Sequence, residues 1–400
     1  MNVARTIKHE LKALWAGGTG LSLAAIATGW GLLVGTRMIY PVLLPHFRST
    51  FDLSLTVAGF LVTILWLGSA IGQLPGGILA DRYSERSVMT AGAVVVAGAI
   101  VLVVTAPTAV ILFVATGLIG LGMSLYPIAR ITILSTIYPD RIGSALGVTM
   151  ATGDLGQTVL PPIAGVLAVT IAWQAGLAFL IPLLLLAGIG LWLRLPSDSG
   201  TDNGGETLSI DTARDVLSEL RQSNIVFMTF ILFLYILVWQ SFTGLYPTYL
   251  VEIKGLSPTV ASLLFSFYFG VGVLVKPIAG GIYDRIGVRG SLVAVLVGPL
   301  FGFALLPIVE GLWALLAVTA LVSTMLGTGA ITQSFLAERF SEAIRGTGLG
   351  AVRTTAATLG AAGPVLFGAI ADRGFFDVGY LLLAALMAVV ILLTLRIPRG

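Results

Sequence analysis

The chain has 400 residues, of which 57% are hydrophobic and only 10% are charged, whereas soluble domains carry roughly 25% charged residues. So few charges cannot cover the surface of a soluble globule of this size, and so apolar a chain is not disordered. With no cysteine and two histidines, the sequence excludes a thiolate nucleophile, an iron–sulfur cluster and a histidine-rich metal site. The net charge of +3 is too small to imply a nucleic-acid partner.

Long apolar runs follow one another along the chain. A bilayer core about 30 Å thick requires about 20 mostly apolar residues per helix. Twelve runs meet this requirement and predict helices 1 to 12, at residues 17–44, 54–79, 87–106, 108–135, 143–169, 172–194, 224–250, 258–282, 290–308, 311–336, 347–370 and 375–395. The runs do not alternate like barrel strands, and the first is too long for a signal peptide. The sequence therefore predicts an all-α membrane protein with twelve transmembrane helices.

The basic residues lie mainly on one side of these spans. If the N-terminus is cytoplasmic, 15 of the 22 lysines and arginines lie on that side, and Arg48, Lys254 and Arg373 lie on the other. This distribution follows the positive-inside rule. We therefore expect a multi-pass protein of the cell membrane, plasma or inner, with both termini in the cytoplasm.

The chain divides into two similar halves. Its longest polar stretch predicts a cytoplasmic linker at 196–223 between an N-terminal six-helix bundle at 1–195 and a C-terminal one at 224–400. The halves match at a constant offset of 203 residues, as in Pro161 and Pro364. Because each half has an even number of spans, the two copies have parallel topology and are related by an axis along the membrane normal.

The loop after the second span of each half carries the same motif: a glycine, three residues, Asp-Arg and a later arginine. The motif residues are Gly77, Asp81, Arg82 and Arg86 in the first copy and Gly280, Asp284, Arg285 and Arg289 in the second. This pattern resembles the loop signature of the major facilitator superfamily, and the resemblance covers essentially the whole chain. It implies two pseudo-symmetric six-helix bundles that move a small molecule by alternating access. A monomer is sufficient for this, and we expect no metal and no cofactor.

The sequence departs from the family pattern in three places. Ser84 stands where the first loop usually has glycine, and Thr116 stands where many proton-coupled members carry arginine. The helix 5 signature of drug/proton antiporters is only approximate, at Gly153, Gly156, Pro161, Pro162 and Gly165. These departures weaken an interpretation as a drug exporter, which stays an alternative.

The two motif aspartates predict a conformational latch. Asp81 and Asp284 lie at the cytoplasmic ends of helices 2 and 8, on the face where helices 11 and 5 begin. Because helix N-termini attract negative charge, we expect contacts from Asp81 to the start of helix 11 and from Asp284 to the start of helix 5. Such contacts would favour the outward-open state. The alternative is that the motif residues only stabilise short interfacial loops.

Five charged residues lie within predicted spans, where a central charge costs about 2.5–3.5 kcal/mol. They are Arg37, Arg130, Asp154, Lys276 and Arg353, on helices 1, 4, 5, 8 and 11. Helices 3, 6, 9 and 12 carry none, so we expect them to face lipid while the others line a central cavity. Arg130 lies near the inner end of helix 4, where it either faces the cavity or snorkels to the interface.

Four cations against one carboxylate favour an anionic substrate, such as a carboxylate held by arginine forks and a lysine. Lys276 and Arg353 lie at similar depth, and some superfamily members that move small carboxylates carry basic residues on these two helices. The predicted substrate-binding residues are Arg37, Lys276, Arg353, Tyr40, Tyr126, Trp239, Tyr246, Phe269 and Gln333. Asp154 is predicted to serve as a proton site, salt-bridge partner or gate, together with Arg130 and Gln157.

The sequence therefore predicts a secondary active transporter of a small organic anion, working as a proton symporter or an anion exchanger. The alternative is a drug/proton antiporter in which Asp154 carries the proton and the aromatic residues accept lipophilic cations. A membrane enzyme or receptor is disfavoured, because neither clustered catalytic side chains nor a large soluble domain is present.

Overall fold

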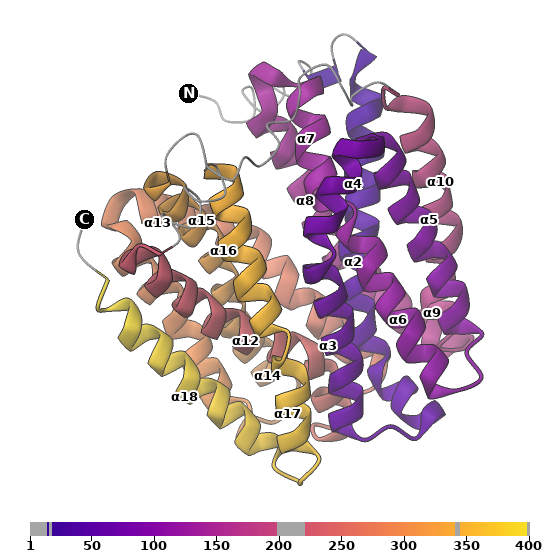
Figure 1. The fold of residues 1–400 in the computed structure, drawn as a ribbon. Coiled ribbons are helices and arrows are strands. Elements are labelled where there is room, and N and C mark those ends of the chain that lie inside the picture. The colour runs from indigo at the N-terminus through magenta and orange to yellow at the C-terminus, as the bar shows by residue number, and fades with distance from the viewer. Residues whose placement is uncertain (1–13, 16–17, 198–220, 341–344, 398–400) are drawn as a thin grey trace. The chain divides into compact units, whose positions relative to one another are not determined.

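The computed structural model describes residues 14–15, 18–197, 221–340 and 345–397. These residues form α-helices and short 3-10 turns, and no strand occurs among them (Figure 1). This confirms the predicted all-α class. Most of the predicted linker, 198–220, lies outside the described residues.

The helices of the first half follow the predicted spans, with three of the spans broken in two. In chain order they are α2 (Gly20–Phe51), α3 (Leu55–Ile71) with α4 (Gln73–Tyr83), α5 (Glu85–Val104), α6 (Ala109–Ser124) with α7 (Pro127–Ile137), α8 (Ile142–Thr170) after the turn η2 (Pro139–Arg141), and α9 (Ala175–Ala178) with α10 (Leu180–Arg194).

The second half repeats this order. Its elements are α12 (Ser223–Glu252), α13 (Pro258–Leu305), α14 (Leu312–Ser323) with η3 (Thr324–Gly327) and α15 (Thr328–Arg339), α16 (Arg345–Gly360) with α17 (Gly363–Ala371), and α18 (Phe376–Thr394). The predicted spans 258–282 and 290–308 both lie in α13.

The two loop motifs turn the chain at equivalent positions. Gly287 has a φ of 70° and kinks α13, and Ser84 has a φ of 147° between α4 and α5. Glycine adopts positive φ without steric cost, whereas serine does not. The sequence departure at Ser84 therefore carries backbone strain in the first copy of the motif.

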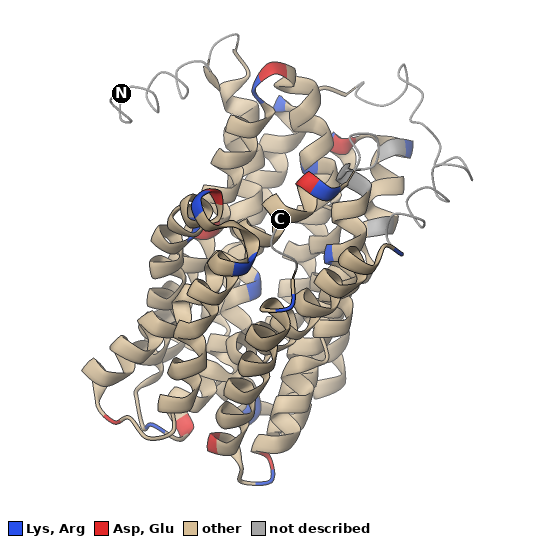
Figure 2. Ribbon diagram, turned by 90° about the vertical axis from the view of Figure 1, so that its left-hand side faces the viewer, with Lys and Arg blue, Asp and Glu red and all other residues tan. Residues whose placement is uncertain are grey.

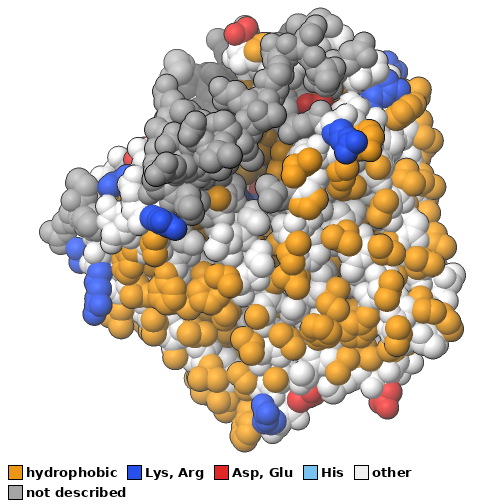
Figure 3. Space-filling model, in the orientation of Figure 1, with side chains coloured by type: hydrophobic (Ala, Val, Ile, Leu, Met, Phe, Trp, Pro, Cys, Tyr) orange, Lys and Arg blue, Asp and Glu red, His pale blue; other side chains and the backbone are white. Residues whose placement is uncertain are grey.

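Nine helices of the described chain are long and apolar enough to cross a membrane. The number is below twelve because α13 holds two spans, α3 is short, and α8 contains polar residues such as Asp154 and Gln157. Most of the charged residues lie towards the ends of the helices, with a few in the helix bodies (Figure 2). Apolar side chains cover much of the helix surface seen in Figure 3.

The chain forms two compact units that differ from the predicted bundles. Unit 1 draws on Met1–Ile39 and Leu67–Gly205, and unit 2 on Tyr40–Trp66 and Glu206–Gly400. The end of α2 and the start of α3, here called the 40–66 hairpin, thus belong to unit 2. The sequence boundaries 1–195 and 224–400 stay a prediction of the transport bundles.

Small residues allow close helix packing inside each unit. In unit 1, a Cβ on Gly156 of α8 would lie 2.0 Å from the carbonyl oxygen of Gly31 on α2. Such contacts are how membrane helices gain packing energy without a hydrophobic driving force. In unit 2, α12 packs on α16, α17 and α18, and α13 packs on α14 and α18.

Candidate functional site

Two predicted site residues meet in unit 2. Arg353 on α16 donates a long hydrogen bond of 3.5 Å from Nη1 to Oε1 of Gln333 on α15. Both side chains are exposed, although each lies within an apolar helical segment. Lys276 on α13 is half-buried. The structure therefore presents a planar cation together with an amide, a pair that can bind a carboxylate.

The predicted coupling residues lie in unit 1. Gln157 donates from Nε2 to Oδ1 of Asp154 over 2.8 Å, one turn apart on α8. Asp154 is half-buried and Gln157 is buried. Arg37 on α2 is half-buried. The amide contact holds Oδ1 of the Asp154 carboxyl group against the neighbouring turn of α8.

Arg130 is held inside unit 1. Its side chain is 7% exposed, its Cζ lies 4.0 Å from the centroid of the Trp30 ring, and its Nη1 donates to Oγ1 of Thr149 over 2.8 Å. A snorkelling arginine would extend to the interface, so this interpretation of Arg130 is wrong. The side chain instead joins α7 to α2 and α8.

Most of the predicted aromatic contacts lie in the packed interior. Tyr126 donates to the carbonyl oxygen of Ile26 over 2.8 Å, and the hydroxyls of Tyr246 and Thr319 are 2.5 Å apart. The predicted residues with at most 1% exposure are Tyr40, Tyr126, Tyr246 and Phe269. Their assignment as substrate contacts stays a prediction that requires rearrangement. Trp239 is half-buried and meets Trp66 edge-on, with ring centroids 5.0 Å apart.

The predicted cytoplasmic latch is only partly described. The side chain of Asp81 and residues 341–344 lie outside the described part of the structure. Asp284 and Arg285 are exposed, and Arg86 stacks on Trp192 with its Cζ 4.1 Å from the ring centroid. The latch itself stays a prediction.

The sequence analysis missed a set of contacts at the other end of unit 2, where α2 and α3 are joined. There Asp372 accepts hydrogen bonds from the backbone N–H groups of Leu55, at 2.6 Å, and Thr56, at 2.9 Å. Nearby, Arg48 forms an ion pair with Glu252. The sequence did carry a signal for Asp372. The repeat places the apolar residue Val169 at the equivalent position, so the acid is present in only one of the two copies.

These contacts change the acidity of Asp372. Burial alone raises the pKa of its carboxyl group, but hydrogen bonds from Thr56, Ser54 and Leu55 outweigh burial and place the pKa below its ordinary value of 3.8. Asp372 is therefore ionised at neutral pH, as a charge that stabilises a helix N-terminus should be.

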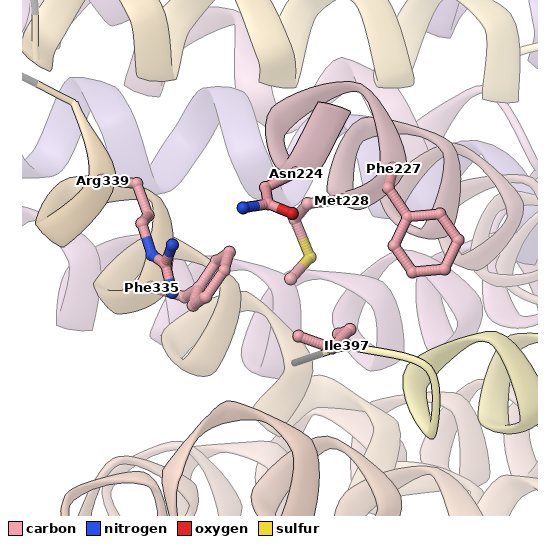
Figure 4. Close-up of a pocket in the computed structure, with 6 residues that line it drawn as sticks. All are labelled: Asn224, Phe227, Met228, Phe335, Arg339 and Ile397. Carbon is pink, nitrogen blue, oxygen red and sulfur yellow. The ribbon is translucent and has the colours of Figure 1, made fainter. Parts of the chain in front are cut away.

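Unit 2 also contains a small cavity near the start of α12 and the end of α15, whose lining side chains are drawn in Figure 4. It is lined by Asn224, Phe227, Met228, Phe335, Arg339 and Ile397. Its volume of about 10 Å³ suits about one water molecule. It includes none of the predicted substrate-binding residues, and it is too small for an organic anion.

Comparisons with known proteins agree with this architecture. The family model described as Major Facilitator Superfamily matches residues 21–329 and 228–400. The hexuronate transporter of Bacillus subtilis (strain 168) is 26% identical over 388 residues, which cover 91% of this chain and 90% of that protein. The probable nitrate/nitrite antiporter NarK1 of Thermus thermophilus is 28% identical over 296 residues, 70% of this chain and 62% of that protein.

Solved structures share the fold at low sequence identity. A variant of the nucleoside transporter NupG superposes with a TM-score of 0.81 at 14% identity, over 94% of this chain and 99% of that one. The loop motifs, the repeated spans and the family match over nearly the whole chain lead to one conclusion: this chain belongs to the Major Facilitator Superfamily of membrane transporters.

Proposed function

We propose that the chain moves a small organic anion bearing a carboxylate across the membrane by alternating access, as a proton symporter or an anion exchanger. The N- and C-termini are proposed to be cytoplasmic, as the positive-inside rule favours. The transporter works as a monomer and needs no cofactor.

The arginine on α16 carries this proposal. Among the described residues, Arg353 bonds only the neutral side chain of Gln333, and no carboxylate neutralises it. Placing an exposed guanidinium against lipid is energetically unfavourable. Its position within an apolar segment therefore favours a water-filled path that carries an anionic substrate. A planar fork of N–H donors matches a carboxylate in a bidentate geometry.

The relatives add support from outside the chain. The names of the two matched relatives denote carriers of a hexuronate and of nitrate or nitrite, both of which are anions. The hexuronate carrier matches over nearly its whole length. An organic acid is therefore the first substrate class to test.

The test uses thermal stabilisation of the purified protein by a panel of carboxylates, with nitrate and lipophilic cations as the other arms. Carboxylates should raise the midpoint of unfolding, and Arg353→Gln should abolish the shift while Arg353→Lys keeps part of it. Arg396→Gln, which removes an exposed charge beyond the end of α18, is the matched control.

Uptake of the stabilising carboxylate into proteoliposomes then establishes transport. A pH gradient should drive uptake by a symporter, and internal anion should drive it by an exchanger. Stabilisation by lipophilic cations alone, unaffected by Arg353→Gln, would contradict the proposal and support the drug antiporter alternative.

A further inference from the structure

The N-terminus of α3 is capped by a residue from a distant helix. Asp372 follows α17 and accepts hydrogen bonds from the N–H groups of Leu55 and Thr56 and from the hydroxyl of Thr56. Ser54 accepts a hydrogen bond from the N–H of Val57 over 3.3 Å. The first N–H groups of a helix have no partner within it, so a carboxylate here satisfies them and favours the positive end of the helix dipole.

The same two helices touch backbone to backbone. A Cβ on Gly59 of α3 would lie 2.3 Å from the carbonyl oxygen of Pro364, and a Cβ on Gly368 of α17 would lie 2.3 Å from that of Leu55. Neither position admits a side chain unless the helices move apart. Asp372 and the two glycines therefore hold one tight crossing, here called the α3–α17 seal.

The seal joins segments from different halves of the sequence, because α3 belongs to the N-terminal half and α17 to the C-terminal half. α2 and α3 each run without a break from unit 1 into the 40–66 hairpin of unit 2. Alternating access separates the halves at one end of the molecule at a time. For the end at the 40–66 hairpin to open, the hairpin must leave unit 2, and the contacts at Asp372, Gly59 and Gly368 must break.

We infer that the α3–α17 seal keeps the hairpin end of the transporter closed and sets how often that end opens. The positive-inside rule places this end outside the cytoplasm, opposite the predicted latch at Asp81 and Asp284. The inference goes beyond the proposed function and does not depend on the identity of the substrate.

The seal has no symmetric counterpart. At the offset of 203 residues, Val169 replaces Asp372 and Pro258 replaces Leu55. A valine side chain cannot accept a hydrogen bond, and proline has no N–H to donate. The local serine cap is present in both copies, because Ser257, the equivalent of Ser54, accepts from the N–H of Val260 over 3.4 Å. The carboxylate cap is thus a feature of one repeat only.

The absence of cysteine makes the seal measurable. Val62 on α3 has no exposed surface, and the chain contains 0 cysteines. Val62→Cys therefore introduces a single thiol, and its rate of labelling by a membrane-impermeant maleimide reports opening. Asp372→Ala should raise that rate about fivefold, the equilibrium shift that corresponds to loss of a helix cap. Asp372→Asn, which keeps an acceptor but loses the charge, should give a smaller increase. Glu310→Gln, another exposed acid in unit 2, should give none.

Adding a methyl group where α3 contacts α17 tests the same seal and leaves Asp372 unchanged. Gly59→Ala should raise the labelling rate at Cys-substituted Val62, whereas Gly98→Ala on α5, where a Cβ meets nothing within 4 Å, should not. Leu292→Cys, at another fully buried position of unit 2, separates opening from general loosening. Unchanged labelling at position 62 in both the Asp372→Ala and Gly59→Ala variants, or equal increases at positions 62 and 292, would overturn the inference.

Discussion

The guanidinium of Arg130 lies over the indole ring of Trp30, with its Cζ 4.0 Å from the ring centroid. Tyr126 stacks on the same indole, with centroids 6.2 Å apart. A cation over an indole is attracted by the ring quadrupole, and more strongly when water is excluded. The charge of Arg130 therefore helps hold α7 against α2 in unit 1.

Arg130→Lys should destabilise the protein by about 1 kcal/mol, because an ammonium group keeps the charge but cannot stack flat on Trp30 and also reach Thr149. The measurement is the thermal unfolding midpoint in detergent. Arg194→Lys, at an exposed position at the end of α10, should leave the midpoint unchanged. If the two variants unfold at the same temperature, the stacking contributes nothing measurable.

The Arg48–Glu252 ion pair joins the 40–66 hairpin to α12 and is partly exposed, with side-chain exposures of 21% and 31%. Reversing one charge, by Arg48→Glu or Glu252→Arg, should increase labelling of the Val62→Cys reporter. Combining both reversals should restore the parent rate, because the pair is rebuilt with opposite polarity. The single-variant effects should shrink in high salt, since exposed pairs are screened and contribute at most about 1 kcal/mol. A double variant that labels as fast as the single ones would rule out direct pairing.

Ser84→Gly should stabilise the protein. A serine held at a φ of 147° costs about 1–3 kcal/mol, while replacing serine by glycine at a helix N-cap loses only a few tenths of a kcal/mol. The expected net gain is about 1 kcal/mol, measured as a higher unfolding midpoint. The converse change, Gly287→Ser at a φ of 70°, should lower the midpoint. An unchanged or lower midpoint for Ser84→Gly, or an unchanged or higher midpoint for Gly287→Ser, would contradict the strain argument.

The α3–α17 seal should not respond to pH near neutrality. The pKa of Asp372 lies below 3.8 because its hydrogen bonds outweigh burial, so its stabilising contribution is complete above that ordinary value and is lost as the pH falls through the folded-state pKa. Other charged residues lie close in sequence to the residues of the seal. Asp52 precedes Leu55, and Arg373 and Asp377 follow Asp372. Labelling of the Val62→Cys reporter, corrected for the ionisation of the thiol with a free-thiol standard, should be flat from pH 8 to about pH 5. A step within that range would show that another group controls the seal.

The helices were predictable because a membrane span needs a long apolar run, and such a run is visible in the sequence. The broken helices were not. The ends of α3 and α6 depend on how each turn packs against its neighbours. The kink at Gly287 and the turn at Ser84 share one motif, and there the repeat indicated the turn correctly.

The candidate site divides in the same way. Arg353 and Gln333 could be proposed because polar side chains within apolar spans are conspicuous, and the structure brings the two to hydrogen-bonding distance; their role in binding stays a prediction. The sequence left two alternatives open for Arg130, because its depth alone did not reveal the ring of Trp30, which lies 100 residues away from Arg130 in sequence. Stacking partners of this kind are set by helix packing.

By itself the sequence determined the membrane environment, the number of spans, the repeat and the charges that favour an anion, because hydropathy and residue type are local properties. Only the tertiary structure decided that Asp372 caps α3, that Gly59 lies against Pro364 and that Arg48 meets Glu252. Each contact joins residues about 200 to 320 positions apart, and their meeting depends on how α3 crosses α17 and how α2 lies against α12. The symmetry of the repeat could not supply them, because the residues that make the seal are those in which the two copies differ.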